Sequence, residues 1–217
     1  MTDWQAWHLA YDDPHSDLSG RRRAVQRRIE AWLDGRPDED LRVVSACSGD
    51  GRDLLEVLAR RPDGGRVSAL LLELDEGLAA SASAFAAEHD LQRVDVRRDD
   101  AGVTDSYADA VPADLVMLCG VLGNLADEDA RATVAASREL SAPGALVIWT
   151  RGRFADGDPH GGVGEPTDRV RSWFAEDGFE EVGYDAPRGT GFRVGAHRLV
   201  AEPTPLVTGH TFFTFTR

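Results

Sequence analysis

The feature that most constrains this fold is a regular alternation between short apolar runs and segments with helical spacing. Turn signals such as Pro-Asp-Gly-Gly separate the two kinds of segment. Strands that read as near-continuous apolar runs are typical of a parallel sheet covered on both faces. The sequence therefore predicts an α/β fold with helices at residues 22–34, 53–61, 77–89, 127–140 and 168–177, and strands at 41–46, 67–74, 93–97, 113–122, 144–150, 179–185 ("FEEVGYD") and 210–217 ("HTFFTFTR").

Composition narrows the class of molecule. With 217 residues and 42% apolar content, the chain is long enough for one domain with a proper core. No stretch approaches the roughly 20 apolar residues of a membrane span, and "MTDWQ" lacks the regions of a signal peptide. Two cysteines, Cys47 and Cys119, are too few for a disulfide framework or a zinc site. We therefore expect a cytoplasmic protein with no membrane partner and no metal.

The formal net charge of -14 bears on the choice of partner. A field of this sign repels phosphate backbones, which disfavours nucleic acid as a substrate. The acidic residues are spread along the chain, which favours a well-solvated surface. All 24 basic residues are arginine, so the chain has no lysine for a Schiff base or a Walker-type phosphate site.

The turn after the first strand, "SACSGDGRDLL", is the most informative stretch. In a parallel sheet the ligand lies outside the carboxyl ends of the strands. Gly49 and Gly51 allow positive φ and a close approach of the backbone to a ligand, and Asp53 suits the start of the following helix. The alternative is a glycine turn that is tightened for packing alone.

The next strand ends offer acceptors for an adenosine ligand. Glu73 follows the second strand, roughly 20 residues after the glycine turn, where a carboxylate typically accepts both hydroxyls of a ribose. After the third strand, Asp99 and Asp100 are placed to accept from an adenine amino group. A thin loop, "CGVLGN", follows the fourth strand. The order of these features predicts an adenosine derivative, whereas ordinary solvated acids are the alternative.

The kind of adenosine ligand follows from what the first turn lacks. A pyrophosphate prefers G-x-G-x-x-G at a helix N-terminus, but the third glycine position holds Leu54. Asp50 and Asp53 would repel a pyrophosphate and would suit the ammonium and sulfonium groups of S-adenosylmethionine (SAM). This disfavours the alternative of a nicotinamide-dependent oxidoreductase on a dinucleotide-binding sheet.

The same segments occur in the order of a known family. "VVSACSGDGRDLL", "ELDEGLAASA", "RRDDAG" and "ADLVMLCGVLGNL" resemble the first four motifs of the class I SAM-dependent methyltransferases, and "LSAPGALVIWT" resembles their fifth strand. The opening "WQAWHLAYDDPHSDL" is similar to that of a group of actinobacterial methyltransferases. The resemblance spans roughly residues 41–150. It implies a doubly wound, Rossmann-like, seven-stranded and mostly parallel sheet, with an antiparallel last strand and helices on both faces.

The resemblance also implies roles for single residues. Gly49 and Gly51 would lie under the methionine part of SAM, Glu73 would hold the ribose, and Asp100 would meet the adenine amino group. Two positions depart from the family, because its first motif usually has an acid and a glycine where this chain has Ser45 and Cys47. The expected cofactor-binding residues are Tyr11, Arg21, Cys47, Ser48, Gly49, Asp50, Gly51, Asp53, Glu73, Leu74, Asp100, Ala101, Cys119, Gly120, Val121 and Leu122.

The segment before the first strand is aromatic and acidic. In the resembled family such segments often form a lid, so we expect residues 1–40 to be an N-terminal helical lid segment and residues 41–217 the SAM-binding domain. Tyr11 and Arg21 are the candidates to meet the carboxylate of the cofactor. A helix that packs onto the sheet through Trp4 and Trp7 is the alternative.

The acceptor is expected at the loop after the fifth strand, residues 150–169, which is long, glycine-rich and charged. Such loops are usually functional or disordered, and Arg151, Arg153 and His160 are its substrate-side candidates. Methyl transfer needs a general base only if the nucleophile must lose a proton. The candidates for catalysis are His8, Asn124 and His160.

The sequence therefore predicts an enzyme that transfers the methyl group of SAM to a small-molecule acceptor. Two alternatives stay open. One is the nicotinamide-dependent oxidoreductase, and the other is a non-catalytic protein that binds SAM without turning it over.

Overall fold

The computed structural model describes residues 11, 13–152 and 166–215. The strands are β1 (Leu41–Ala46), β2 (Val67–Leu72), β3 (Val94–Arg97), β4 (Ala113–Leu118), β5 (Ser141–Gly152), β6 (Phe179–Asp185) and β7 (Phe192–Leu199). The helices are α2 (Asp17–Asp34), α3 (Arg52–Arg60), α4 (Glu76–Glu88), α5 (Asp127–Leu140) and α6 (Pro166–Glu176), with short 3-10 turns η2 (Gly64–Arg66) and η3 (Thr104–Tyr107).

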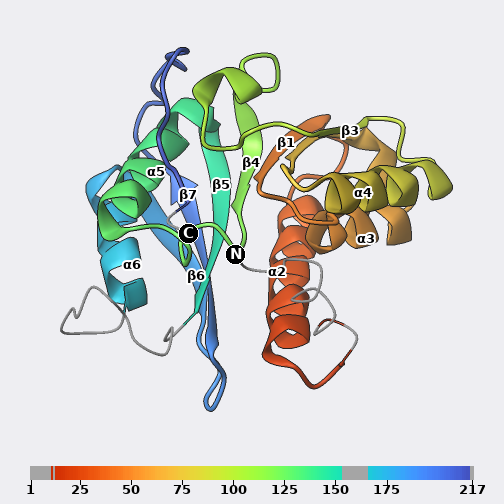
Figure 1. The fold of residues 1–217 in the computed structure, drawn as a ribbon, viewed down its shortest axis with the longest axis horizontal. Helices are drawn as coiled ribbons and strands as arrows, with labels where there is room; N and C mark the ends of the chain where they lie inside the picture. The colour runs from red at the N-terminus through yellow and green to blue at the C-terminus, as the bar shows by residue number, and fades with distance from the viewer. Residues whose placement is uncertain (1–10, 12, 153–165, 216–217) are drawn as a thin grey trace.

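These strands form one seven-stranded sheet in the order β3-β2-β1-β4-β5-β7-β6 (Figure 1). The pairs among β1 to β5 are parallel, and β7 runs antiparallel between β5 and β6. The strand order reverses beside β1, so the carboxyl ends of β1 and β4 lie next to each other at the switch point, where such sheets bind ligands. The predicted Rossmann-like sheet with an antiparallel last strand is confirmed.

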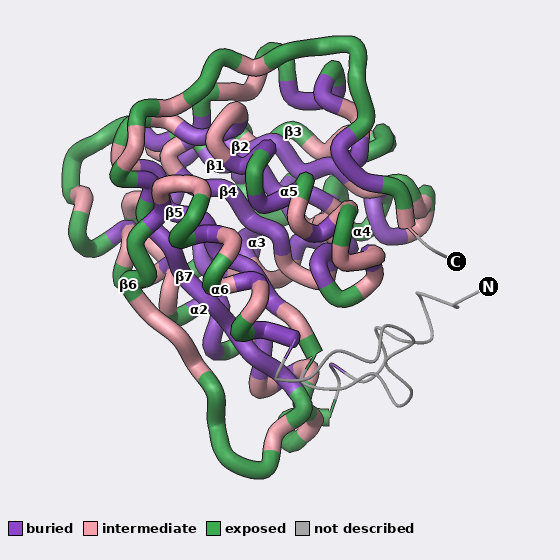
Figure 2. Tube along the Cα trace, turned by 90° about the vertical axis from the view of Figure 1, so that its left-hand side faces the viewer, coloured by how far each residue is buried: buried purple, intermediate pink, exposed green. Residues whose placement is uncertain are grey.

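Helices cover both faces of the sheet. α2, α3 and α4 lie on one face and α5 and α6 on the other (Figure 1). The sheet between them is largely buried (Figure 2), as expected for strands made of near-continuous apolar runs. Ile148 packs into the cluster under α2 and α3, while its neighbour Trp149 packs with Phe174 under α5 and α6.

Helix α2 begins at Asp17, earlier than the predicted residue 22. The cause is a cap, because the Ser16 side chain accepts a hydrogen bond from the Ser19 backbone N–H. Val25, Ile29 and Leu33 are fully buried against the sheet, so α2 belongs to the packed core. Trp4 and Trp7 lie outside the described residues.

The predicted last strand over residues 210–217 is wrong for its described part, because residues 210–215 form no strand of the sheet. The last strand is β7, whose glycine and charged residues hide its pattern in the sequence. A Cβ on Gly195 would lie 2.2 Å from Trp149 Cε2, so the glycine makes room for that ring. His197 is only 1% exposed and its Nδ1 accepts from Trp149 Nε1 at 3.1 Å. This hydrogen bond satisfies Nδ1, whereas among the described residues no group hydrogen-bonds the buried Nε2, which lies 3.7 Å from Glu181 Oε2.

The aromatic run near the carboxyl end has a different role. The crossover from β3 to β4 contains only the short turn η3, and residues 200–215 pack where a helix would otherwise cover the sheet. Phe212 and Phe213 are buried, and the Phe212 ring lies 5.9 Å from that of Tyr107. In this segment the described β pairing is an isolated bridge between Thr211 and Val103. The apolar residues of this segment therefore pack into the core.

Candidate functional site

The loop between β1 and α3 is held in a tight left-handed path. The Ser48 N–H donates to Leu72 O at 2.9 Å, which ties the loop to the end of β2. Cys47, Gly49 and Gly51 have φ values of 50°, 60° and 72°. Cys47 therefore keeps the conformation that favours glycine, at the position where the resembled family has one.

Packing accounts for one glycine of this loop. A Cβ on Gly51 would lie 2.7 Å from both Leu55 Cδ1 and Leu71 Cδ2. The adjacent Asp50 carboxylate is paired with Arg52, whose Nε lies 2.7 Å from Asp50 Oδ2. The charge of Asp50 is therefore already offset. Attraction of a positively charged ligand group to this turn depends on Asp53.

The Glu73 side chain links the loop after β1 to the segment after β2. Its Oε2 accepts from the Gly49 N–H at 2.7 Å, and its Oε1 accepts from the Asp75 N–H at 2.8 Å. A carboxylate has about four lone-pair sites, so each oxygen can accept one more hydrogen bond. Asp75 is engaged elsewhere, because its Oδ1 caps α4 by accepting from Leu78 N–H at 2.9 Å. Leu74 between them is 56% exposed.

The end of β3 brings a second carboxylate to the same edge. Asp100 is exposed, and its Oδ1 accepts from the Gly102 N–H at 2.8 Å. The adjoining Ala101 is buried, and its carbonyl accepts from Tyr107 OH at 2.7 Å. Burial raises the pKa of the Cys47 thiol, and the nearby carboxylates of Glu73 and Asp100 raise it further. The structure thus brings both predicted adenosine acceptors to one place.

A buried polar cluster lies on the α2 side of this edge. Arg21 donates to the Tyr11 hydroxyl, and the Arg52 guanidinium lies 4.6 Å from the Tyr11 ring centre. Burial raises the pKa of Asp53, while the Arg21 charge opposes that shift. Among the described residues, no group hydrogen-bonds the enclosed Asp53 Oδ1. An ammonium group from a ligand would satisfy such an oxygen.

The loop after β4 closes the cluster. Arg21 Nη1 is 4.0 Å from the position of a Cβ on Gly120, whose own φ is 82°. This turn ends β4 at Leu118, so the predicted strand over 113–122 is too long. The Gly120 N–H donates to Thr150 Oγ1 at 2.8 Å, and Asn124 Nδ2 donates to Gly120 O at 2.6 Å. The loop is therefore held by the ends of β4 and β5.

The two apolar residues of this loop point inward. Val121 and Leu122 are both 0% exposed and belong to the core cluster under α5. They therefore support the loop from beneath. Burial also raises the pKa of the Cys119 thiol. Cys119 and Cys47 are free thiols that pack against opposite faces of the sheet.

Arg151 joins the loops after β4 and β5. Its Cγ lies 3.8 Å from the position of a Cβ on Gly123. Its guanidinium lies 3.4 Å from Asp127 Oδ1, and Arg169 Nη1 lies 2.5 Å from the other oxygen of that carboxylate. Arg153, His8 and His160 lie outside the described residues.

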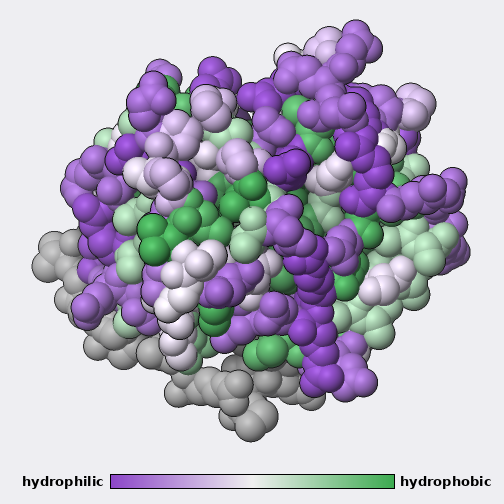
Figure 3. All heavy atoms as spheres, turned by 90° about the horizontal axis from the view of Figure 1, so that it is seen from above, coloured by the Kyte–Doolittle hydropathy of each residue, from purple (hydrophilic) through white to green (hydrophobic). Residues whose placement is uncertain are grey.

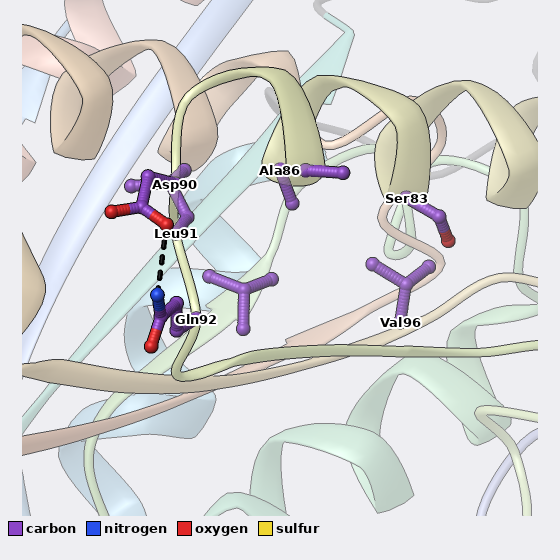
Figure 4. Close-up of a pocket in the computed structure, with 8 residues that line it drawn as sticks. Ser83, Ala86, Asp90, Leu91, Gln92 and Val96 are labelled. Carbon is purple, nitrogen blue, oxygen red and sulfur yellow. Dashed lines mark hydrogen bonds between the residues drawn. The ribbon is translucent and has the colours of Figure 1, made fainter.

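Two other surfaces of the molecule differ from this edge. A groove between α4 and β3 is lined by residues from Ser83 to Val96 (Figure 4). It follows the end of α4 and the start of β3, away from Glu73 and Asp100. Figure 3 looks onto the edge where the parallel strands begin, and it shows mostly hydrophilic residues around a hydrophobic patch. Neither surface gathers the predicted residues.

Residues 11, 13–152 and 166–215 contain neither a metal-binding cluster nor a helix that could span a membrane. In this part of the chain, no group of three His, Cys, Asp or Glu side chains is placed to hold a metal ion. No helix within these residues is both long and apolar enough to span a membrane.

Sequence reasoning missed several contributors to the edge. The role of Thr150 could have been predicted, since this residue ends the fifth predicted strand, next to the charged loop. The role of Arg52 was harder to predict, because its pairing with Asp50 depends on the geometry of the turn. Arg193 gave no signal, because β7 was not recognised as a strand.

Comparison with solved structures identifies the fold. A magnesium protoporphyrin IX methyltransferase from Synechocystis PCC 6803, solved with bound S-adenosylhomocysteine (SAH), is 17% identical with a TM-score of 0.67, over 90% of this chain and 93% of that chain. A candidate rRNA methylase from Clostridium thermocellum is 14% identical with a TM-score of 0.59, over 86% of this chain and 97% of that chain. The fold is therefore the Rossmann-like fold of SAM-dependent methyltransferases.

A third similar structure has a higher sequence identity. It is N,N-8-amino-8-demethyl-D-riboflavin dimethyltransferase from Streptomyces davawensis, 26% identical with a TM-score of 0.53, over 73% of this chain and 49% of that chain. This chain thus spans about half the length of that protein. Neither a protein-family model nor a curated protein sequence matches the chain.

Proposed function

We propose that this chain is an SAM-dependent methyltransferase that acts on a small molecule. The observation that carries the proposal is the Glu73 carboxylate, which Gly49 and Asp75 hold at the end of β2 through their N–H groups. Both of its oxygens keep acceptor capacity, and Asp100 stands beside it at the end of β3. In this position Glu73 accepts the two ribose hydroxyls and Asp100 accepts from the adenine amino group. Leu74 offers exposed apolar surface next to the ribose acceptor.

The cluster under α2 fits the methionine part of the cofactor. Asp53 Oδ1 and Ser48 Oγ are enclosed polar atoms that no described residue hydrogen-bonds. The ammonium group takes Asp53 as its partner in this proposal. The carboxylate group takes Arg21 and Tyr11, which reach the same place from α2 and the segment before it. The loop from Cys119 to Leu122 forms the wall between this cluster and the acceptor.

SAM, when bound, supplies a methyl group that is electrophilic because it is attached to a sulfonium. The residues of the chain then position the acceptor for an in-line approach and exclude water. In this proposal Asn124 orients the acceptor, and the hydrogen bond from its amide to Gly120 O supports that role. Cys47 and Cys119 stay protonated because burial raises the pKa of both thiols. A general base, where the acceptor needs one, is assigned to His8 or His160.

The small-molecule acceptor and the lid are further parts of this proposal. The net charge of -14 disfavours a phosphate backbone as acceptor, and two of the similar structures are enzymes named for a porphyrin and a riboflavin derivative. In this proposal residues 1–40 form the N-terminal segment that provides the lid over the cofactor, and residues 41–217 form the SAM-binding domain, in the cytoplasm. Deleting residues 1–15 tests the lid, because unchanged SAH affinity and turnover would exclude it.

Calorimetry with SAH, SAM and NAD tests the function. We expect binding of SAH and SAM and no binding of NAD. The proposal fails if NAD binds while both SAM species give no heat. A protein that binds SAM but methylates nothing in a broad screen of small-molecule and RNA acceptors would be a non-catalytic SAM-binding protein.

A further inference from the structure

The carboxyl-end segment, residues 200–215, is bound to the loop after β3 by a compact group of hydrogen bonds. The His210 carbonyl accepts from the Thr104 backbone N–H at 3.0 Å and from Thr104 Oγ1 at 3.0 Å. The His210 N–H in turn donates to Thr104 Oγ1 at 3.3 Å. Thr104 is only 1% exposed, so its contacts are shielded from competing water. This pair therefore anchors the segment to the start of η3.

Two further hydrogen bonds lie on either side of this anchor. The Phe212 N–H donates to Gly102 O at 2.9 Å, before η3. The Gly209 N–H donates to Asp105 Oδ2 at 2.7 Å, within η3. The segment is thus attached to the loop at three successive places along its backbone.

The loop that receives these bonds also carries the carboxylate assigned to the adenine. Asp100 Oδ1 accepts from the Gly102 N–H at 2.8 Å, and the Asp100 carbonyl accepts from Ser106 Oγ at 2.8 Å. Gly102 therefore holds Asp100 through its N–H and the carboxyl-end segment through its carbonyl. A Cβ on Gly102 would lie 2.3 Å from Phe213 O, so the two chains are in close contact here.

Aromatic packing connects the same elements from beneath. Phe212 and Phe213 are 6% and 3% exposed, and the Phe212 ring lies 5.9 Å from that of Tyr107. The Tyr107 hydroxyl donates to Ala101 O at 2.7 Å, directly after Asp100. Release of the segment would uncover Tyr107 and would remove the Phe212 hydrogen bond from Gly102 at once. The position of Asp100 is thus coupled to the docking of the segment.

We propose that the carboxyl-end segment positions Asp100 for the adenine amino group, with Asp105 as a positioning residue that acts through the segment. The inference rests on the proposed function, because it concerns the adenine end of the same cofactor site. Coupling between binding equilibria is reciprocal. Docking of the segment therefore improves the affinity for the cofactor, and a bound cofactor stabilises the docked segment by the same factor.

The chain offers a matched pair of variants for the test. Asp105 and Glu139 are carboxylates that each accept one backbone N–H of the segment, from Gly209 at 2.7 Å and from Val207 at 3.0 Å. Asp105→Ala and Glu139→Ala thus remove the same charge and the same kind of bond. Only the first bond reaches the loop that carries Asp100, because Glu139 belongs to α5.

Calorimetry compares SAH with S-inosylhomocysteine, in which a carbonyl oxygen replaces the adenine amino group. We expect Asp105→Ala to weaken SAH about fivefold or more, at the lower end of usual coupling factors. The preference for SAH over S-inosylhomocysteine should fall in this variant, since Asp100 is no longer held towards the amino group. Glu139→Ala should keep the affinity and the preference of the wild type. Asp105→Asn serves if the alanine variant does not fold.

Hydrogen exchange in the wild type tests the reciprocal effect without any variant. Saturating SAH should slow the exchange of the Thr104 and Phe212 amides, whereas methionine, which lacks the adenine, should not. The inference is overturned if SAH binds but leaves both amides unchanged, or if Asp105→Ala keeps the affinity and preference of the wild type. A wild type that binds no SAH would overturn the proposed function instead.

Discussion

The two halves of the ligand-facing edge are built from opposite charges and by different means. The half at the ends of β1, β2 and β3 presents the carboxylates of Glu73 and Asp100, each held by backbone N–H groups. The half at the ends of β5 and β7 presents Arg151 and Arg193, placed by strand pairing. The first half is the one that we propose for the adenosine of the cofactor, and the second is the one that we propose for the acceptor.

The difference lies in how far apart in sequence the cooperating groups are. Glu73 and the loop that it fixes belong to consecutive strand–turn–helix units, which many proteins of this fold repeat. Arg151 and Arg193 belong to strands that meet only after the chain has turned back on itself. The cofactor half is therefore readable from local pattern, whereas the acceptor half depends on the register of distant segments.

The largest expected effect is in the cofactor half, at Glu73. Glu73→Ala should leave two ligand hydroxyls poorly paired and should release the Gly49 N–H that shapes the β1 loop. We expect SAH affinity to fall by about 2–4 kcal/mol, roughly 30- to 1000-fold, when measured by calorimetry. Glu73→Gln should cost less, because one acceptor oxygen remains.

Glu76→Ala is the matched control, since it removes an exposed carboxylate that pairs with Arg98 near the same strand end. Asp75 is unsuitable, because it caps α4. If Glu76→Ala and Glu73→Ala lose equal affinity, the overall negative charge attracts the ligand and Glu73 does not bind the ribose hydroxyls specifically.

The second effect concerns pH and lies beneath the acceptor half. Burial lowers the pKa of His197 from 6.5 to about 4. The unfolded chain therefore takes up a proton that the folded chain refuses, so stability is complete above pH 6.5 and is lost as the pH falls towards 4. The loss amounts to about 3 kcal/mol. Denaturant unfolding between pH 7 and 4.5 measures it.

The cofactor half should respond with the opposite sign. Burial raises the pKa of Asp53, so its contribution to stability is present at low pH and is lost as the pH rises through its folded pKa.

The His197→Phe variant tests the prediction for His197. It should be less stable than the wild type at pH 7, because Trp149 Nε1 loses its acceptor, yet it should lose less stability on acidification. An unchanged pH slope in this variant would contradict the assignment.

The third effect is at Gly102, where the carboxyl-end segment crosses the cofactor half. A Cβ there would lie 2.3 Å from Phe213 O and 3.2 Å from Asp100 Oδ1. Gly102→Ala should cost about 1–3 kcal/mol of unfolding free energy, as overpacking does. It should also weaken SAH binding several-fold, because Asp100 is displaced.

Gly65→Ala is the control for that substitution, because a Cβ at Gly65 meets no atom within 4 Å. Limited proteolysis of both variants shows whether residues 200–215 are released. If Gly102→Ala loses stability but keeps full SAH affinity, the segment supports the fold without shaping the ligand site.

The smallest effect is at Cys47, whose φ of 50° suits glycine. Cys47→Gly relieves left-handed strain of about 1 kcal/mol but gives up a buried thiol and adds freedom to the unfolded chain. We expect a net stability change below about 1 kcal/mol and unchanged SAH affinity. A marked gain in affinity would show that the thiol obstructs the site.

Most of the fold was predictable because the apolar runs match the buried strands closely. The exceptions have physical causes. β7 contains Gly195 and His197, which are buried by fitting against one aromatic ring and so do not look like core residues. The run "HTFFTFTR" looks like a strand because its aromatic residues are buried, although they fill the place of a missing helix.

The candidate site was predictable where backbone geometry decides and less so where side chains interact. Glu73 and Asp100 follow their strands as expected and converge at one edge. The pairing of Asp50 with Arg52 was not predicted, because it forms only once the turn is folded. Val121 and Leu122 were expected near the ligand but are turned into the core.

The hydrogen bonds between the carboxyl-end segment and η3 have a consequence for biosynthesis. Thr104 Oγ1 donates to the carbonyl of His210, across 106 positions of sequence. Because a nascent chain emerges from the ribosome amino end first, the loop after β3 lacks this partner while four further strands, β4 to β7, are made. Until then the apolar surface around Tyr107 stays uncovered. The proposed cofactor site is therefore complete only after residues 200–215 have been made, and a chain halted after β7 would expose this apolar surface to chaperones.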